Sequence, residues 1–173
     1  MEMPIVIYGS PVLRKKSFDI TKNSEITPLT DDLLATLKKQ QGIGLAAPQV
    51  GLLKNLFVID TTGYQNDNIE KIEKAYINPE ILERSEDTNY FEEGCLSIPG
   101  IFEEVKRPEK IAVRYLNTQS NWQEEELSGI TARIFQHEYD HLQGILFIDH
   151  LSRLKRKMLG RKLNSLAKNA VRR

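Results

Sequence analysis

Cysteine, tryptophan and histidine are scarce in this chain, which has one, one and three of them among 173 residues. A single cysteine excludes an intramolecular disulfide and is typical of proteins kept in a reducing compartment. No apolar run approaches the roughly 20 residues that span a bilayer, and residues 1–8 are too few for the apolar part of a secretory signal. We therefore expect a cytoplasmic protein without a membrane segment.

Two of the three histidines stand in one H-E-x-x-H segment, formed by His137, Glu138 and His141. Positions i and i+4 lie on one face of a helix, so both imidazoles can reach one metal ion with the glutamate beside it. Apolar residues recur at helical spacing around the segment, Ser128 is placed to cap the helix, and Gly144 is placed to end it. The segment predicts a metal-activated water with a carboxylate base.

The third metal ligand separates one class of hydrolase from another. In the H-E-x-x-H-x-x-G-x-x-H pattern the third histidine position is Phe147, which cannot bind metal. Peptidases that take a carboxylate from a later helix need Asp or Glu downstream, and no acidic residue follows Asp149. Asp149 and His150 are interpreted as surface or capping residues because they lie beyond the break at Gly144.

Cys95 is the remaining soft ligand. A thiolate with two imidazoles and an open position for water is an accepted catalytic set. The alternative of an inert buried cysteine is disfavoured by the neighbouring glycine and the Pro99-Gly100 turn. A second alternative, Cys95 as a nucleophile, leaves Glu138 and one histidine without a role.

The elements predicted from periodicity favour an α+β fold, with mixed or antiparallel sheets wrapped around a central metal-binding helix and with a C-terminal helix. The predicted helices and strands precede or follow turn-rich segments such as 61–68 and 117–121. A helix is predicted at 30–41 and strands at 55–60, 74–78, 110–117 and 122–127. Hydrophobic residues make up 40% of the chain and charged residues 28%, which is ordinary for one domain of this length.

The run GIGLAAPQVG at residues 42–51 has neither the third glycine of a dinucleotide site nor the lysine of a phosphate loop. Together with EGCLS at 93–97 and QHEYDH at 136–141, its first eight residues resemble the three signature motifs of the peptide deformylase family. The opening GSPVLR at 9–14 also resembles that family's N-terminal segment, and the resemblance extends over about residues 4–154.

The resemblance implies a hydrolase that removes the formyl group from the N-terminal formylmethionine of new polypeptides and releases formate. It also implies one divalent metal ion and favours ferrous iron. Ligand softness alone permits zinc, nickel and cobalt as well. By position, the resemblance assigns Cys95, His137 and His141 as metal ligands and Glu138 as the general acid/base. It assigns Gln49 and the backbone of Leu96 as oxyanion donors, and the backbone at Ile43, Gly44 and Gly94 as substrate-binding groups. Gln49 closing a turn on the backbone, and Glu93 pairing with Arg107, are further interpretations of the residues themselves.

Charge is distributed unevenly, because residues 151–173 hold nine Lys/Arg and no Asp/Glu while residues 1–150 hold 15 basic and 24 acidic residues. We expect a catalytic part at 1–150 and a basic C-terminal helix at 151–173 packed on the same domain. The apolar stripe predicted for this helix comprises Leu151, Leu154, Met158, Leu159, Leu163 and Leu166. Its basic face is either a solvated surface or, as in some members of the resembled family, a ribosome-binding surface.

Two other functions compete with deformylation. One is a metallopeptidase that cuts internal peptide bonds, and the other is a metal-stabilised module whose basic helix contacts RNA. Glu138 and Gln49 argue against the module, since a structural site would close its fourth position with a protein ligand. Formate release from formylmethionine peptides, compared with casein cleavage, separates the three functions.

Overall fold

Two antiparallel sheets form the framework of the computed structural model, which describes residues 2–65 and 69–170. The larger sheet has the strand order β1-β2-β3-β6-β7, and β4 pairs with β5 in a separate hairpin. The strands are β1 (Gly44–Ala46), β2 (Leu56–Asp60), β3 (Glu73–Arg84), β4 (Thr88–Cys95), β5 (Ile98–Pro108), β6 (Lys110–Leu116) and β7 (Trp122–Ser128). All named strand pairs are antiparallel.

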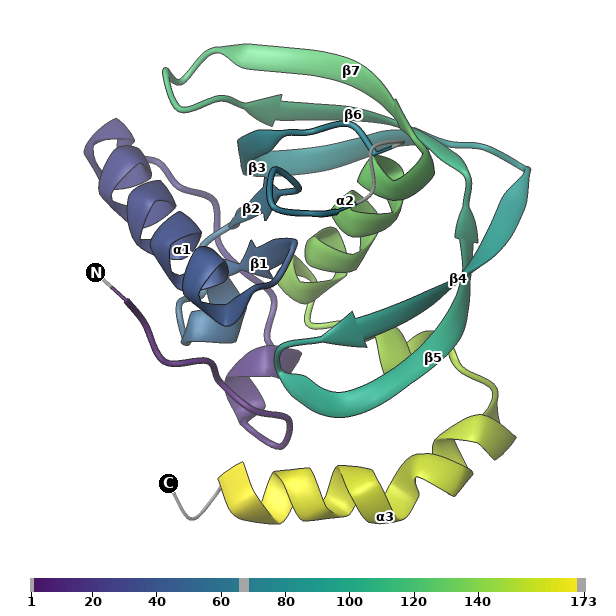
Figure 1. Cartoon of the computed structure of the whole chain (residues 1–173). Coiled ribbons are helices and arrows are strands. Elements are labelled where there is room, and N and C mark those ends of the chain that lie inside the picture. The colour runs from purple at the N-terminus through teal and green to yellow at the C-terminus, as the bar shows by residue number, and fades with distance from the viewer. Residues whose placement is uncertain (1, 66–68, 171–173) are drawn as a thin grey trace.

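In the part of the chain that the structure describes, three α-helices accompany the sheets: α1 (Ile26–Gln40), α2 (Gly129–Leu142) and α3 (Arg153–Ala170). Figure 1 shows α2 lying between the larger sheet and the β4–β5 hairpin, with α3 crossing below them. This arrangement confirms the predicted α+β fold around a central helix. Within the described residues, no helix has the length and apolar character needed to cross a bilayer.

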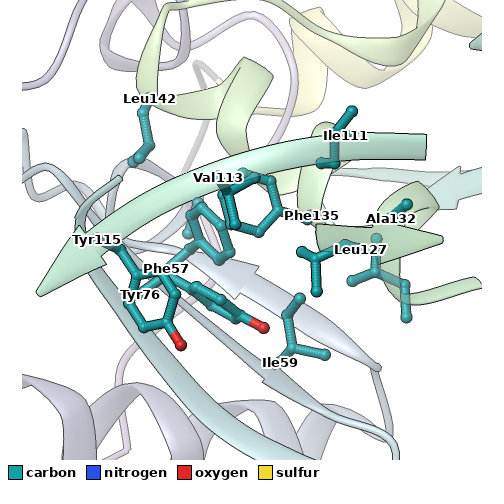
Figure 2. Packing of buried hydrophobic residues seen from close by; sticks show 12 residues of the cluster. Phe57, Ile59, Tyr76, Ile111, Val113, Tyr115, Leu127, Ala132, Phe135 and Leu142 are labelled. Atoms are coloured by element: carbon teal, nitrogen blue, oxygen red, sulfur yellow. The ribbon is translucent and has the colours of Figure 1, made fainter. Parts of the chain in front are cut away.

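Aromatic side chains attach α2 to the larger sheet. Phe135 of α2 meets Phe57 and Tyr76 edge-on, each with its ring centroid 4.9 Å away. Figure 2 shows these rings gathered with Tyr115, and the ring centroids of Tyr76 and Tyr115 lie 4.6 Å apart. Edge-on aromatic pairs of this kind add roughly 0.5–1.5 kcal/mol beyond the area they bury. The packing therefore fixes the helix that carries the H-E-x-x-H segment.

The predicted strands are all present, although β3 extends to Arg84, six residues beyond the predicted end. Helix α1 begins at Ile26, earlier than predicted, and ends where Gln41 adopts a left-handed conformation. Strands β4 and β5 were not predicted, because paired glutamates, glycine and proline interrupt their alternation. The last three residues of the predicted turn 61–68 lie outside the described residues.

The predicted ends of the metal helix are confirmed with one difference. Ser128 occupies the N-cap position, but its side chain makes no capping hydrogen bond. Gly144 follows the helix with φ +74°, and an added Cβ there would lie 2.6 Å from the carbonyl oxygen of Arg14. A glycine is therefore required both for the left-handed backbone and for the close approach of the N-terminal segment.

Helix α3 packs on the rest of the molecule by a narrower stripe than predicted. Leu151 and Leu163 are buried, and Leu159 and Leu166 pack partly buried against them. Leu154 and Met158, by contrast, are 69% and 76% exposed. These two residues do not belong to the packing face, so the prediction that they do was wrong.

Candidate metal centre

Three candidate ligand side chains converge where the end of β4 meets the C-terminal half of α2. One ligand atom from each of Cys95, His137 and His141 lies within 4.8 Å of the other two. The Sγ atom of Cys95 is 3.3 Å from Nε2 of His141. The two imidazoles, one helical turn apart, have ring centroids 5.2 Å from each other. The tertiary structure thus brings together the three side chains that the sequence suggested as ligands.

The chemistry of these side chains fits a divalent cation. Nδ1 of His137 lies 2.9 Å from Glu93, so Nε2 is the ring nitrogen that could bind a metal ion. Burial raises the pKa of the Cys95 thiol, but the adjacent His141 and His137 outweigh it and lower that pKa to about 5. A thiolate is the form that binds metal. Soft sulfur with two imidazole nitrogens suits zinc, ferrous iron, cobalt and nickel.

Glu93 is the centre of a buried ionic cluster behind His137. Its carboxylate accepts hydrogen bonds from Arg107 at 2.6 and 3.0 Å and from Arg133 at 2.9 Å, in addition to its contact with His137. Burial alone would raise the pKa of Glu93, but hydrogen bonds from His137 and Arg107 lower it well below the ordinary value. The predicted pairing of Glu93 with Arg107 is confirmed. A carboxylate behind a metal-binding histidine orients the ring and makes it a stronger ligand.

The ionic cluster continues from Arg107 to the surface. Nη1 of Arg107 donates to Asp140 at 2.7 Å, and His150 lies 2.7 Å from the same carboxylate oxygen. Asp140 therefore lies behind the candidate ligands, joined to Glu93 through Arg107. His150, interpreted as a surface or capping residue, is partly exposed and closes the outer end of the cluster.

Arg133 was missed in the sequence. Besides Glu93, it donates to the carbonyl oxygens of Val105 and Asn89 at 2.9 and 3.0 Å. It thereby ties α2 to both strands of the hairpin that carries Cys95. The signal was its position four residues before His137, which places both side chains on one face of the helix.

Glu138 of α2 is buried beside the candidate ligands Cys95, His137 and His141. Burial raises its pKa to about 7, although His137 and His141 act in the opposite direction. Its Oε2 atom has no hydrogen-bond partner among the described residues. A Cβ added to Gly44 would lie 2.5 Å from Oε1 of Glu138, so the glycine at this position leaves room for the carboxylate.

Gln49 has its two amide atoms in different environments. Oε1 accepts the backbone N–H of Ala46 at 2.8 Å, which is the turn-closing bond proposed for it as an alternative role. Nε2 lies 3.4 Å from both Sγ of Cys95 and Oγ of Ser97. The bond at Ala46 thus orients the side chain so that its N–H groups face the candidate metal ligands.

A cavity of about 580 Å³ opens onto these groups. The remaining residues predicted for the site, Ile43, Gly44, Gly94 and Leu96, all line it together with Cys95, His137 and Glu138. Apolar side chains from the hairpin and α2 complete the wall, among them Phe91, Phe102, Ile130 and Ile134. A mostly apolar cavity with a few convergent polar groups is typical of a small-ligand or peptide site.

Comparisons with known proteins agree on one family. The model of the polypeptide deformylase family matches residues 2–157. A peptide deformylase of Cytophaga hutchinsonii is 46% identical over 171 residues, covering 97% of this chain and 92% of that protein. One from Thermotoga maritima is 45% identical, covering 97% of this chain and 98% of that protein.

Solved structures give the same result. The crystal structure of a mutant of peptide deformylase 1B from Arabidopsis thaliana superposes with a TM-score of 0.89 at 38% identity, covering 96% of this chain and 90% of that one. The peptide deformylase of Thermotoga maritima superposes with a TM-score of 0.80 at 44% identity, covering 88% and 99%.

Proposed function

The chain belongs to the polypeptide deformylase family and is a metal-dependent hydrolase that removes the formyl group from N-formylmethionine peptides, and we propose that Cys95, His137 and His141 bind its metal ion. The convergence of these ligand atoms beside the buried Glu138 is the observation that supports the proposal most strongly. The site thus buries a thiol, two imidazoles and a carboxylate whose Oε2 atom has no hydrogen-bond partner among the described residues. Burying such groups costs free energy unless a ligand compensates.

The proposed ion is ferrous iron. The thiolate and imidazoles also suit zinc, nickel and cobalt, so the preference for iron comes from the family resemblance. When bound, a divalent cation supplies Lewis-acid activation of water near neutral pH. Elemental analysis after anaerobic purification tests the proposal, and a preparation active with zinc as its only metal would contradict it.

Glu138 is the proposed general acid and base. With a pKa of about 7, its carboxylate is ready to accept a proton from water and to hold it at neutral pH. Water then attacks the formyl carbon, and hydrogen-bond donors must stabilise the negative charge that develops on the formyl oxygen. Glu138 returns the proton to the leaving amine as the carbon–nitrogen bond breaks. Water thus supplies one of the two oxygens of formate, the formyl group supplies the other, and one carboxylate serves both halves of the reaction.

Gln49 and the backbone N–H of Leu96 are the proposed donors to the oxyanion. The support is the orientation of Nε2 of Gln49 toward Cys95, held by the bond from Ala46. Donors fixed in advance cost no reorganisation when the charge develops, and each can contribute about 3 kcal/mol to lowering the barrier. Backbone groups at Ile43, Gly44 and Gly94 are proposed to pair with the peptide, with Ile43 also lining the methionine pocket.

Two variants test the site. Glu138→Gln should retain the metal but lower formate release from formylmethionine peptides at least about a hundredfold, because it removes the proton acceptor. Cys95→Ser should lose metal during dialysis, because a hard hydroxyl replaces a soft thiolate. Casein serves as the control substrate, and cleavage of casein at a comparable rate would favour the metallopeptidase. Near-normal formate release by Glu138→Gln would contradict the proposed acid/base role.

A basic surface on α3 supports a further proposal, that the helix binds ribosomal RNA near the exit of formylated nascent chains. The segment 151–173 carries nine basic residues and no acidic residue, and phosphate groups match such a surface. Charge reversal of Lys157, Arg161 and Lys162 should abolish co-sedimentation with ribosomes at low salt and leave formate release from free peptides unchanged. Equal co-sedimentation of the unsubstituted protein and the charge-reversed variant would contradict ribosome binding through α3.

We also propose that the chain is a single domain, with residues 1–150 as its catalytic part and 151–173 as the basic helix packed on it. We propose that the protein is located in the cytoplasm. Leu163 of α3 shares a buried cluster with Leu13, Ile98 and Phe147 of the catalytic part, which supports one domain. Cytoplasmic location is supported by the substrate, which is made there, and by a lone cysteine used as a metal ligand.

A further inference from the structure

The N-terminal segment, residues 6–17, makes a backbone hydrogen bond to each of the three parts of the site. The N–H of Val6 donates to the carbonyl oxygen of Gln49 at 2.7 Å, and that of Tyr8 donates to Ser97 at 2.8 Å. The N–H of Ser17 donates to the carbonyl oxygen of Leu142, also at 2.8 Å. Three pieces of chain that are distant in sequence are thus bonded to one short segment.

Each acceptor lies at or beside a residue with a proposed role. Gln49 is itself a proposed oxyanion donor, and Ser97 lies two residues after Cys95. Leu142 directly follows His141 at the end of α2. A displacement of any of these carbonyl groups would therefore move a functional side chain with it.

The segment is held in place from its other side. The side chains of Val6, Tyr8, Val12 and Leu13 share a hydrophobic cluster with Leu159, Leu163 and Leu166 of α3. A Cβ added to Gly9 would lie 2.6 Å from Cα of Ala167, so the backbone of the segment touches the helix directly. Figure 1 shows the N-terminal segment and its 3-10 turn running above α3. The segment is thus packed between the site and α3.

We propose that residues 6–17 are a positioning segment that sets where Gln49, Cys95 and His141 lie relative to one another. The proposal rests on the roles given to these residues under the proposed function. Its physical basis is that catalysis depends on sub-ångström placement, and a shift of about 1 Å can cost roughly a hundredfold in rate. Hydrogen bonds between main-chain groups, supported by packing from α3, restrict such shifts.

The bonds made by Val6 and Tyr8 should have separable effects. Loss of the Val6 bond frees Gln49, which affects stabilisation of the oxyanion and hence kcat. Loss of the Tyr8 bond frees the turn after Cys95, which affects retention of the metal. A segment that only contributed to stability would produce neither pattern.

Proline substitutions test this because they remove the N–H donor. Val6→Pro should lower kcat by about tenfold to a hundredfold with little change in KM, since misplaced groups cost rates of this order. Its Co²⁺ retention against a chelator should stay near that of the unsubstituted protein. Tyr8→Pro should release Co²⁺ at least about tenfold faster, as expected for a disturbed support of a metal ligand, and should alter the cobalt–thiolate absorption band.

Ile7→Pro is the matched control, because the Ile7 amide donates no backbone hydrogen bond to a residue that the structure describes. It should leave both kcat and Co²⁺ retention near those of the unsubstituted protein. Should a proline variant fail to fold, replacing Val6 or Tyr8 by its α-hydroxy acid removes only the N–H, and the same two measurements apply. Parallel losses in all three variants, or no change in any, would overturn the proposal.

Two further variants distinguish failure of this proposal from failure of the proposed function. Gln49→Ala should lose kcat by about a hundredfold or more if Gln49 is an oxyanion donor. If Gln49→Ala is fully active, the role of Gln49 is wrong, but the effect of Tyr8→Pro on Co²⁺ retention still tests the positioning segment. That measurement needs no deformylation at all.

Discussion

Helices α2 and α3 have similar amphipathic patterns but differ in how much of their surface is buried. Ten of the fourteen residues of α2 are buried, among them charged and polar ones, whereas Leu163 is the only buried residue of α3. Of the buried polar residues of α2, Arg133 and His137 contact the carboxylate of Glu93, while the charged side chains of α3 stay in water. The contrast indicates that a helix can bury a charged side chain where another element supplies an oppositely charged partner, and removal of that partner tests this.

The largest effect on stability is expected from Glu93→Gln. The substitution leaves Arg107 and Arg133 without their shared carboxylate, and breaking a buried ion pair costs about 3–5 kcal/mol. Urea unfolding of the two proteins measures the loss. The control is Glu103→Gln, because Glu103 pairs with Glu93 across the hairpin but makes an exposed ion pair with Lys155. That control should cost less than about 1 kcal/mol, and equal losses would show that the buried cluster is not special.

A smaller effect is expected where α3 meets the molecule. Leu163→Ala removes a buried side chain at the edge of the core and should lower the free energy of unfolding by about 2 kcal/mol, the lower end for such truncations. Leu154→Ala, on the exposed side of the same helix, should change it by less than about 0.5 kcal/mol. Thermal unfolding of both variants checks the contrast. A comparable loss from Leu154→Ala would mean that the packing face is wrongly assigned.

The smallest effect concerns the pH dependence of Asp149, in the 3-10 turn that precedes α3. Burial raises the pKa of Asp149, but the hydrogen bond from Arg14 outweighs it and lowers that pKa below its ordinary value. A depressed pKa in the folded protein means that this carboxylate stabilises the fold above the pKa of the unfolded chain, about 3.9, and that the contribution is lost as pH falls through the folded value. The part-exposed pair should contribute less than about 1 kcal/mol.

The measurement is the difference in unfolding free energy between the unsubstituted protein and Asp149→Asn. It should be present at pH 7 and should shrink toward zero as pH is lowered below about 3.9. A difference that grows under acid would contradict the assigned direction of the pKa shift.

Sequence patterns predicted the metal helix and most of the larger sheet because their signals are local. His137 and His141, at positions i and i+4, lie on one face of the helix whatever the helix packs against. The same reasoning failed for β4 and β5, because paired glutamates, glycine and proline interrupt the alternation of their residues. Periodicity also placed Leu154 and Met158 on the packing face of α3. It identifies an apolar stripe on a helix, but not how much of that stripe contacts the rest of the molecule.

The order of residues along the chain already shows which chemical groups are available: one thiol, two imidazoles and a carboxylate at helical spacing, and a glycine beside each functional segment. Three further features became visible in the folded chain: Cys95 meets the histidines, Arg133 and Arg107 share Glu93, and residues 6–17 join the three parts of the site. These two kinds of feature differ in the range of the interactions that produce them. Helical spacing is set by neighbours along the chain, whereas convergence of β4, α2 and the N-terminal segment depends on packing between elements far apart in sequence.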